Sequence, residues 1–311
     1  MNKKKLLIVE DAVEVRIDRY LRRVYPRLPQ SQIEKLLRKK KILLNGCKSI
    51  SSSRVSDGDK ITILVDLASI STEQKPLQRE EALTNEQHQE IASWILWEDE
   101  HLLILNKPAG LACQGGSRVK SHLDNLLQRY DSSKKFRLTH RLDKDTSGVL
   151  VVAKTAIMAA HVTKCFRDKS ITKAYWAVVN GQPSPGEGRI EAALSKGTGR
   201  PKERVFIDKD GSKAITEFRT LKRLGREKAW LELYPLTGRT HQLRAHMEYI
   251  NCPIAGDPKY GSPDNEPSLQ LHARKISFRD LDNILLTFTA PPPQHMEKIL
   301  HKFAVHYDQY A

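Results

Sequence analysis

The sequence has few cysteines, few aromatic side chains and no long apolar run. Its four cysteines are scattered and show no CxxC spacing: Cys47, Cys113, Cys165 and Cys252. This argues against a zinc knuckle or a disulfide framework and favours a reducing compartment. No apolar run approaches the ~20 residues that span a bilayer. The run behind the N-terminal lysines is too short for a signal peptide. We therefore predict a cytoplasmic protein with no membrane segment.

Acidic residues are also in deficit. The 311 residues include 52 Lys and Arg against 37 Asp and Glu, a formal charge of +15. A basic surface of this size indicates a polyanionic partner, nucleic acid first. The excess is concentrated in residues 1–65, which carry 16 cations against 7 carboxylates, whereas residues 66–93 carry 2 against 6. The change of sign predicts a domain boundary, with residues 66–93 as a linker.

Residues 13–65 are patterned as a small independent module. One helix has its apolar residues on a single face: Ile17, Tyr20, Leu21 and Val24. Pro26 and Pro29 end it, and Ser31 with Glu34 forms a capping-box pattern that opens a second helix. Asn45-Gly46 then lies between the apolar run 42–44 and a later strand at 61–65, which predicts a turn at this pair.

The second helix runs into four consecutive cations, here called the basic run: Arg38, Lys39, Lys40 and Lys41. Cations in the last turn of a helix interact favourably with the helix dipole, so part of this charge can serve to stabilise the helix. However, no acidic residue lies four positions away to neutralise the run. The order of helices, basic run and strands resembles the S4 RNA-binding domain over about 50 residues. The basic run is therefore expected to contact RNA.

Residues 94–311 alternate many short strands with few helices, which predicts a mixed, mainly antiparallel α+β domain. The most polar stretch in this region is residues 139–148, directly before the apolar run 149–153. Asp143 and Asp145 in this stretch have an ordinary reading as turn residues. Polar groups at the mouth of a buried strand are costly unless they are paired or used, so a catalytic reading of this turn stays open.

Five segments match the RluA-type pseudouridine synthases in order: residues 105–110, 140–148, 173–181, 236–246 and 253–261. The signature-like segment reads His140-Arg141-Leu142-Asp143-x-x-Thr146-Ser147-Gly148. The resemblance covers about residues 94–290 and implies a pseudouridine synthase fold. The context of residues 106–117 is most similar to the RluC subgroup, which acts on 23S ribosomal RNA.

The resemblance implies a catalytic set of Asp143, Tyr175 and Arg244. Asp143 is the carboxylate beside C1′, and Arg244 pairs with it and keeps it ionised. Tyr175, which otherwise reads as a core aromatic, stacks on the uracil and helps to remove the C5 proton. Asp145 points the other way in an extended segment and is left as a structural residue.

Three further residues are expected to contact RNA. By resemblance, Arg141 fills the gap left by the flipped base. Arg239 and Lys107 are candidate phosphate contacts. The histidines at 140, 241 and 246 show no metal-binding spacing, so we predict no metal. Isomerisation of uridine is redox-neutral, so no cofactor is expected either.

These features predict a monomeric enzyme that isomerises uridines in 23S ribosomal RNA. A tRNA-directed synthase and a catalytically inactive RNA-binding or ribosome-assembly factor are the alternatives. A nucleoside hydrolase that uses Asp143 is a third reading. The basic N-terminal module argues against it, because a small nucleoside needs no extended phosphate-binding surface.

Overall fold

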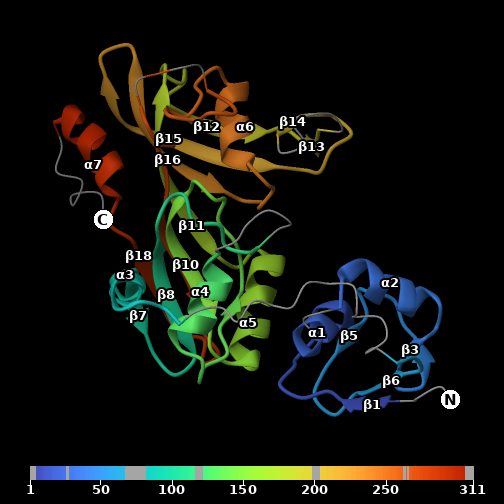
Figure 1. The fold of residues 1–311 in the computed structure, drawn as a ribbon. Helices are drawn as coiled ribbons and strands as arrows, with labels where there is room; N and C mark the ends of the chain where they lie inside the picture. The colour runs from blue at the N-terminus through green and yellow to red at the C-terminus, as the bar shows by residue number, and fades with distance from the viewer. Residues whose placement is uncertain are drawn as a thin grey trace. The chain divides into compact units, whose positions relative to one another are not determined.

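The computed structural model describes residues 5–25, 28–66, 82–115, 122–197, 204–261, 264 and 266–304. It divides into two compact units (Figure 1). The N-terminal unit is Met1–Ala82 with Ala156–Ala160, and the second unit is Leu83–Thr155 with His161–Ala311. Most of the predicted linker, residues 67–81, lies outside the described residues.

The N-terminal unit packs two helices on a four-stranded antiparallel sheet. The helices are α1 (Ile17–Val24) and α2 (Gln30–Arg38). The sheet order is β1 (Lys5–Ile8), β6 (Lys60–Ile63), β3 (Ile42–Leu44) and β4 (Cys47–Lys48), and β2 (Val15–Arg16) pairs separately with β5 (Arg54–Val55). Ile17, Tyr20 and Leu21 are buried in its core. The predicted apolar face of the first helix is therefore confirmed for these three residues, whereas Val24 at the end of α1 is exposed.

The turns of this unit show one correct prediction and one error. Asn45 and Gly46 have φ values of 49° and 79°, the left-handed pair that a tight hairpin turn requires, and they join β3 to β4. The capping box at Ser31 is wrong, because Pro29 occupies the N-cap position and α2 begins at Gln30. Glu34 instead accepts a hydrogen bond from the Gln30 side chain at 2.9 Å.

The second unit is built on one large sheet. Along its path the strands are β12 (Glu187–Glu191), β15 (Ile215–Leu224), β16 (Lys228–Pro235), β11 (Thr172–Asn180), β17 (Leu271–Arg279), β10 (Ser147–Ala153), β8 (Leu102–Lys107) and β7 (Ile95–Glu98). Two more pair at its sides, β18 (Leu285–Thr289) with β17 and β9 (Arg137–Leu138) with β10. Only β10 and β17 are parallel among the described pairs. The mainly antiparallel α+β prediction is confirmed.

The helices of this unit are short. They are α3 (Asn85–Ser93), α4 (Leu123–Tyr130), the part of α5 (Ala156–Asp168) from His161 onward, α6 (Gln242–Tyr249) and α7 (Gln294–Leu300). A 3-10 turn at His301–Phe303 and a separate hairpin of β13 (Leu194–Lys196) and β14 (Val205–Ile207) complete the unit. In the described part of the chain, no helix has the length and apolar character needed to cross a membrane.

Helix α3 corrects the predicted linker. Residues 82–93 were placed in the linker, but Thr84 caps α3 through a capping box with Gln87. The buried side chain of Ile91 packs in the same core cluster as Leu103 and Leu105. The second unit therefore extends toward the N-terminus beyond residue 94.

Strand β11 separates two cores because successive side chains point to opposite faces of a sheet. On one face, Trp176 and Val178 pack with the apolar residues of α7. On the other face, Ala177 and Val179 pack with α6, and Tyr175 borders this cluster. Helices α6 and α7 therefore cover opposite faces (Figure 1), and Tyr175 lies on the α6 side.

Gly148 permits the close approach of the central strands. Its φ is 115°, and a Cβ atom there would lie 2.2 Å from the carbonyl oxygen of Ala273. Only glycine fits this contact between β10 and β17. This close contact between β10 and β17 fixes the start of β10, and it thereby positions the polar turn that precedes the strand.

Candidate active site

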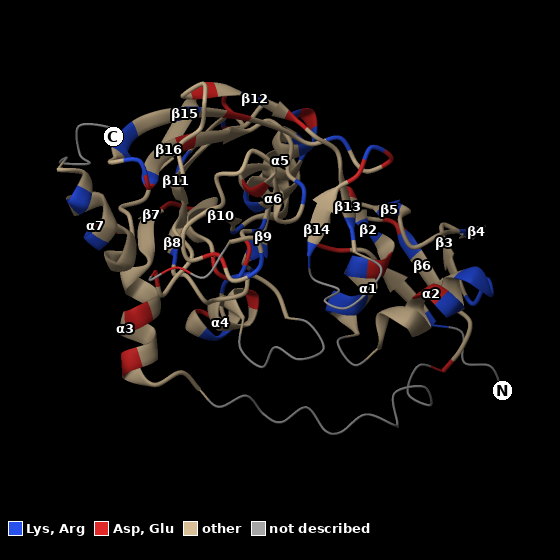
Figure 2. Cartoon of the chain, turned by 90° about the horizontal axis from the view of Figure 1, so that it is seen from above, with Lys and Arg blue, Asp and Glu red and all other residues tan. Residues whose placement is uncertain are grey.

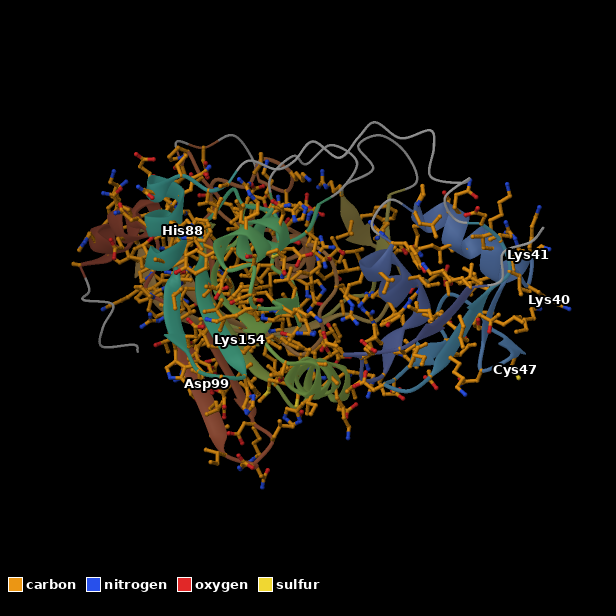
Figure 3. The ribbon with its side chains drawn as sticks, turned by 60° about the horizontal axis from the view of Figure 1, so that its bottom comes forward. Lys40, Lys41, Cys47, His88, Asp99 and Lys154 are labelled. Atoms are coloured by element: carbon orange, nitrogen blue, oxygen red, sulfur yellow. The ribbon has the colours of Figure 1, made fainter. Side chains whose placement is uncertain are left out.

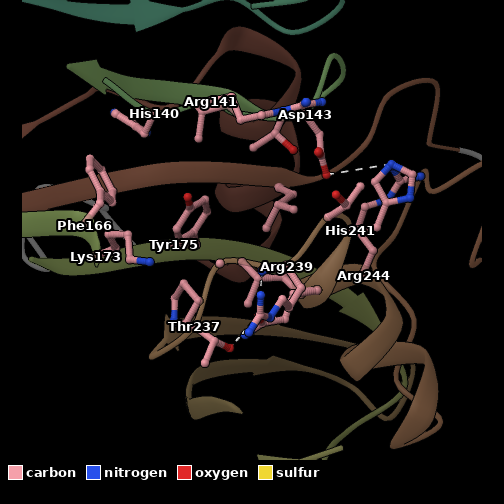
Figure 4. Close-up of a pocket in the computed structure, with 18 of the residues that line it drawn as sticks. His140, Arg141, Asp143, Phe166, Lys173, Tyr175, Thr237, Arg239, His241 and Arg244 are labelled. Atoms are coloured by element: carbon pink, nitrogen blue, oxygen red, sulfur yellow. Dashed lines mark hydrogen bonds and ion pairs between the residues drawn. The ribbon is translucent and has the colours of Figure 1, made fainter. Parts of the chain in front are cut away.

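A cavity of about 280 Å³ brings five of the expected site residues together. They come from the polar turn, from β11 and from the segment around α6: Arg141, Asp143, Tyr175, Arg239 and Arg244. Figure 4 shows Asp143 and Tyr175 entering it from different parts of the chain. Lys107 does not line this cavity. The basic run belongs to the other unit and is described below.

The turn that carries Asp143 is held from behind by the segment that follows β8. The Nζ atom of Lys107 donates to the carbonyl oxygens of Pro108, Leu111 and Lys144 at 2.8, 2.8 and 3.1 Å. Lys107 is 0% exposed. Burial lowers its pKa to about 8, against an ordinary value of 10.5. The expected phosphate contact is therefore wrong, because this amine is buried and supports the turn.

The carboxylate of Asp143 is partly exposed to the cavity and can be reached by a bound molecule. Its side chain is 21% exposed, and His241 Nε2 lies 4.0 Å from its Oδ2 atom. No Lys or Arg among the described residues forms a salt bridge with it. The carboxylate can therefore face a bound molecule.

His241 is held by a chain of hydrogen bonds. The Tyr260 hydroxyl accepts from the Val205 N–H at 2.8 Å and lies 3.1 Å from His241 Nδ1. Tyr260 is buried, so its O–H proton needs an acceptor. Among the described residues Nδ1 is the only partner for it. The proton of His241 is then on Nε2, which faces Asp143.

The environment of His241 keeps its ring neutral. Burial lowers the pKa of His241; the Asp143 and Asp257 charges oppose that effect, and Arg244 and Lys259 add to it. The residue has φ 51° at the N-cap of α6, a left-handed conformation that is uncommon outside glycine and costs energy. The sequence offered no signal for this contact, since the spacing of His241 was informative only about metal binding.

Arg244 is paired differently from the expectation. It is 2% exposed on α6 and forms a bidentate pair with Asp257, with Nε and Nη2 at 2.7 and 2.6 Å from the two carboxylate oxygens. Burial alone lowers the pKa of Arg244, but Asp257 and the more distant Asp143 outweigh it and raise the pKa. The expected direct pair with Asp143 is therefore corrected, although Arg244 still lines the cavity.

Tyr175 is a neutral phenol in this site. Burial, followed by the charges of Asp143 and Cys113, raises its pKa well above the ordinary value. A general base works best with a pKa near the operating pH, so these surroundings disfavour proton abstraction by Tyr175. They leave its ring as an apolar surface for a planar group.

Two more residues of the cavity differ in character. His140 accepts a hydrogen bond from the Val151 N–H at 2.9 Å, its ring lies 4.6 Å from that of Phe166, and burial lowers its pKa to about 3. It is a structural residue. Lys173 is half-buried, and burial lowers its pKa to about 8. The sequence could have indicated Lys173 as a site residue, because residues two apart on a strand point to the same face and Lys173 lies two positions before Tyr175.

The exposed arginines of the cavity remain candidates for RNA contact. Arg141 is exposed at its rim. Arg239 is also exposed, and its Nε donates to the Lys213 carbonyl at 3.1 Å. His246, by contrast, is fully buried and bonded to Thr216 and to the carbonyl of Ala192. The described ranges contain no group of three side chains suited to holding a metal ion.

The N-terminal basic run is exposed along its whole length. Figure 2 marks Lys and Arg in blue at the end of α2, where the run lies. Lys40 and Lys41 extend from the surface of their unit in Figure 3. Within the ranges that the structure describes, the four side chains form no salt bridge of their own. This is the state expected of cations available to an anionic partner.

Known proteins match this chain at the level of both sequence and fold. A family model described as RNA pseudouridylate synthase matches residues 101–249. The ribosomal large subunit pseudouridine synthase C of Rickettsia typhi is 36% identical over 276 residues, covering 87% of this chain and 91% of that protein. The protein of the same name from Vibrio parahaemolyticus is 32% identical and covers 94% of each. The solved structure of human RNA pseudouridylate synthase domain containing 4 has a TM-score of 0.59 and 27% identity, covering 71% of this chain and 96% of that chain.

Proposed function

The chain belongs to the RNA pseudouridylate synthase family, and we propose that it isomerises specific uridines of 23S ribosomal RNA, with Asp143 as its catalytic carboxylate. Family membership makes it an isomerase. The choice of large-subunit RNA is supported by two relatives that carry that substrate in their names and match most of this chain. We also propose a cytoplasmic location, which agrees with a substrate in the ribosome.

One observation carries the chemistry. The accessible carboxylate of Asp143 shares a small cavity with the neutral ring of Tyr175, although the two residues come from separate elements. The reaction breaks the C1′–N1 bond, joins C1′ to C5, and in net balance moves one proton from C5 to N1. Departure of N1 leaves positive charge on the ribose, which an adjacent carboxylate stabilises or traps. The reaction is redox-neutral and needs no cofactor.

Tyr175 is proposed to stack on the uracil. A neutral aromatic ring binds the face of a base, and stacking is worth roughly 1–3 kcal/mol per base. The raised pKa of Tyr175 supports this role over removal of the C5 proton. Arg141, at the rim, is proposed to occupy the gap that the flipped uridine leaves, where unstacking costs a few kcal/mol.

His241 is proposed to position Asp143. Its Nε2–H faces the carboxylate, while Tyr260 holds the other ring nitrogen. A neutral donor orients the carboxylate without cancelling its charge. Arg244 is proposed to act at longer range, since its guanidinium is bound to Asp257 and still interacts electrostatically with Asp143.

The N-terminal unit is proposed to be an S4-like RNA-binding domain. Its support is the sequence resemblance together with the exposed, unpaired basic run. Arg239 of the catalytic unit is proposed as a phosphate contact close to the target uridine. A monomer suffices for this arrangement, because all the proposed catalytic residues come from one unit of one chain.

Substitution of Asp143 tests the chemistry. Asp143→Asn keeps the shape of the turn but removes the negative charge, so no pseudouridine should form while RNA binding persists. Asp145→Asn is the matched control, since Asp145 lies in the same turn but lines a different cavity. Its activity should survive. Full activity in Asp143→Asn would exclude the assignment.

A pseudouridine map tests the substrate. Total RNA from cells lacking the protein should lose pseudouridine at defined 23S sites and regain it when the wild-type chain, but not Asp143→Asn, is restored. Loss confined to tRNA would favour the tRNA-directed alternative. An unchanged map, with a ribosome-assembly defect that Asp143→Asn corrects, would favour an RNA-binding factor.

A further inference from the structure

A second and larger cavity opens beside the active-site cavity. We call it the side groove; its volume is about 1000 Å³, against about 280 Å³ for the active-site cavity. It runs from the end of α5 across β12, β15 and β16 to the loop before α6. The two cavities share part of their lining: Phe166, Lys173, Pro235, Thr237, Gly238 and Arg239. They therefore form one continuous hollow within the second unit.

The side groove is strongly cationic. Six of its lining residues are Lys or Arg, and Glu217 is its only carboxylate. Two of the cations are already committed, because Arg189 pairs with Glu191 and Glu217, and Arg167 pairs with Asp168. The other four form no salt bridge in the part of the chain that the structure describes: Lys169, Lys173, Lys213 and Arg239.

Lys173 lies where the two cavities meet. It is half-buried on β11 and has no hydrogen-bond or ion-pair partner among the described residues. A cation in this position costs free energy unless a partner satisfies it. Figure 4 shows Lys173, Tyr175 and Arg239 around the same space. A negative group placed just outside the base-binding cavity would satisfy Lys173.

We propose that the side groove binds the ribose-phosphate backbone of the single-stranded nucleotides on one side of the target uridine. The inference rests on the proposed function, because it needs a uridine in the adjacent cavity. A base that enters that cavity leaves its own backbone at the opening, and the next phosphates continue into the groove. Its uncommitted cations then contact phosphates without reading the base sequence.

A paired substitution tests this groove. Lys169→Asn with Lys213→Gln removes two charges; asparagine suits the φ of 59° at position 169. Lys298→Gln with Lys302→Gln removes the same charge from the exposed side of α7 and its following turn, on the opposite face of the sheet. Binding of a ribosomal RNA fragment that contains the target uridine is measured at several KCl concentrations for both variants and the wild type.

The groove variant should bind about tenfold more weakly, and the slope of log K against log salt should fall by about 1.4, as expected for two lost single-strand phosphate contacts. The α7 variant should match the wild type. With fragments cut on the 5′ or the 3′ side of the uridine, the difference between the wild type and the groove variant should vanish for one cut and persist for the other.

Two results would overturn the inference. One is an equal salt slope in the groove and α7 variants. The other is an affinity difference between the wild type and the groove variant that persists after both the 5′ and the 3′ cut. These binding slopes judge the groove by themselves. The proposed function is judged separately, by whether the wild-type chain forms pseudouridine in ribosomal RNA at all. A chain that isomerises uridine but shows unchanged slopes therefore refutes the groove alone.

Discussion

Two sets of cations, one from each unit, have opposite surroundings although they contribute alike to the net charge of the sequence. The basic run of the N-terminal unit is exposed and forms no salt bridge within the described ranges. Lys107 and Arg244 of the catalytic unit are buried, and each is bound to several protein oxygens. The first group is available to an external anion, whereas the second builds the site. Net charge therefore measures attraction to RNA only after the buried cations are set aside.

The largest effect should come from breaking the buried pair. Arg244→Met leaves Asp257 as an uncompensated buried charge, which should lower the free energy of unfolding by about 3–5 kcal/mol. Lys40→Met in the basic run should change it by less than about 0.5 kcal/mol. Urea unfolding of the two variants measures the contrast. Equal losses would show that Arg244 is not the structural cation described here.

Lys107→Met should have the next largest effect. Three carbonyl oxygens lose their donor, which should cost about 1–3 kcal/mol of unfolding free energy. The rate of pseudouridine formation should also fall, because Lys144 follows Asp143 in the turn that Lys107 holds. Single-turnover rates at saturating RNA measure this second effect. A stable variant with a normal rate would remove Lys107 from the support of the turn.

The pH dependence of this variant sharpens the contrast. The pKa of Lys107 is about 8 in the folded chain, against an ordinary 10.5, because of burial. Between these values the unfolded chain binds more protons, so the unfolding free energy of the wild type rises with pH. Lys107→Met lacks this contribution. The stability gap between wild type and variant should therefore widen from pH 7 to pH 10. A gap that stays constant over this range would mean that the buried amine remains charged, because both states then bind the same number of protons.

Tyr260→Phe should have a smaller effect, on catalysis. The substitution keeps the ring but removes the hydroxyl that holds His241 Nδ1. His241 can then adopt either tautomer, so the ring nitrogen that faces Asp143 at 4.0 Å no longer always carries the proton. The single-turnover rate should fall about tenfold, or about 1.4 kcal/mol in the transition state, while the Kd for RNA stays unchanged.

The tautomer itself is the control for this prediction. Nitrogen NMR of labelled histidines should show a proton on Nε2 of His241 in the wild type and a mixture in Tyr260→Phe. A wild-type proton on Nδ1 would contradict the arrangement. His241→Gln, which retains a donor near Nε2, should keep more activity than His241→Leu.

The sequence predicted the elements whose pattern is local. Residues 149–153 of strand β10 are a continuous apolar run, and all of them are buried. Strand β17 has no such local pattern, because buried polar residues interrupt it. His272 and Arg274 are buried there and bonded to the carbonyl of Ala290, a partner from a distant segment. These polar side chains find their hydrogen-bond partner only in the tertiary structure, so the local sequence gives no sign that they are buried.

The same limit applied to the site. The turn at Asp143 and the ring of Tyr175 were found from motifs, and both line the cavity. The partners of Lys107 and Arg244 were predicted wrongly, since a cation's exposure and its nearest carboxylate depend on how distant segments meet. His241 gained its role only from Tyr260, which approaches from another loop.

The smallest change in stability should come from the basic run. Replacing Arg38, Lys39, Lys40 and Lys41 with serine removes four exposed cations and should alter the unfolding free energy by less than about 0.5 kcal/mol. RNA binding should respond much more strongly, with a salt slope lower by about 3 if each cation meets one phosphate. The two variants therefore differ in what they lose: Arg244→Met loses folding stability, whereas the basic-run variant loses affinity for RNA. A basic-run variant that binds RNA with an unchanged slope would mean that exposure alone does not identify RNA-binding cations in this chain.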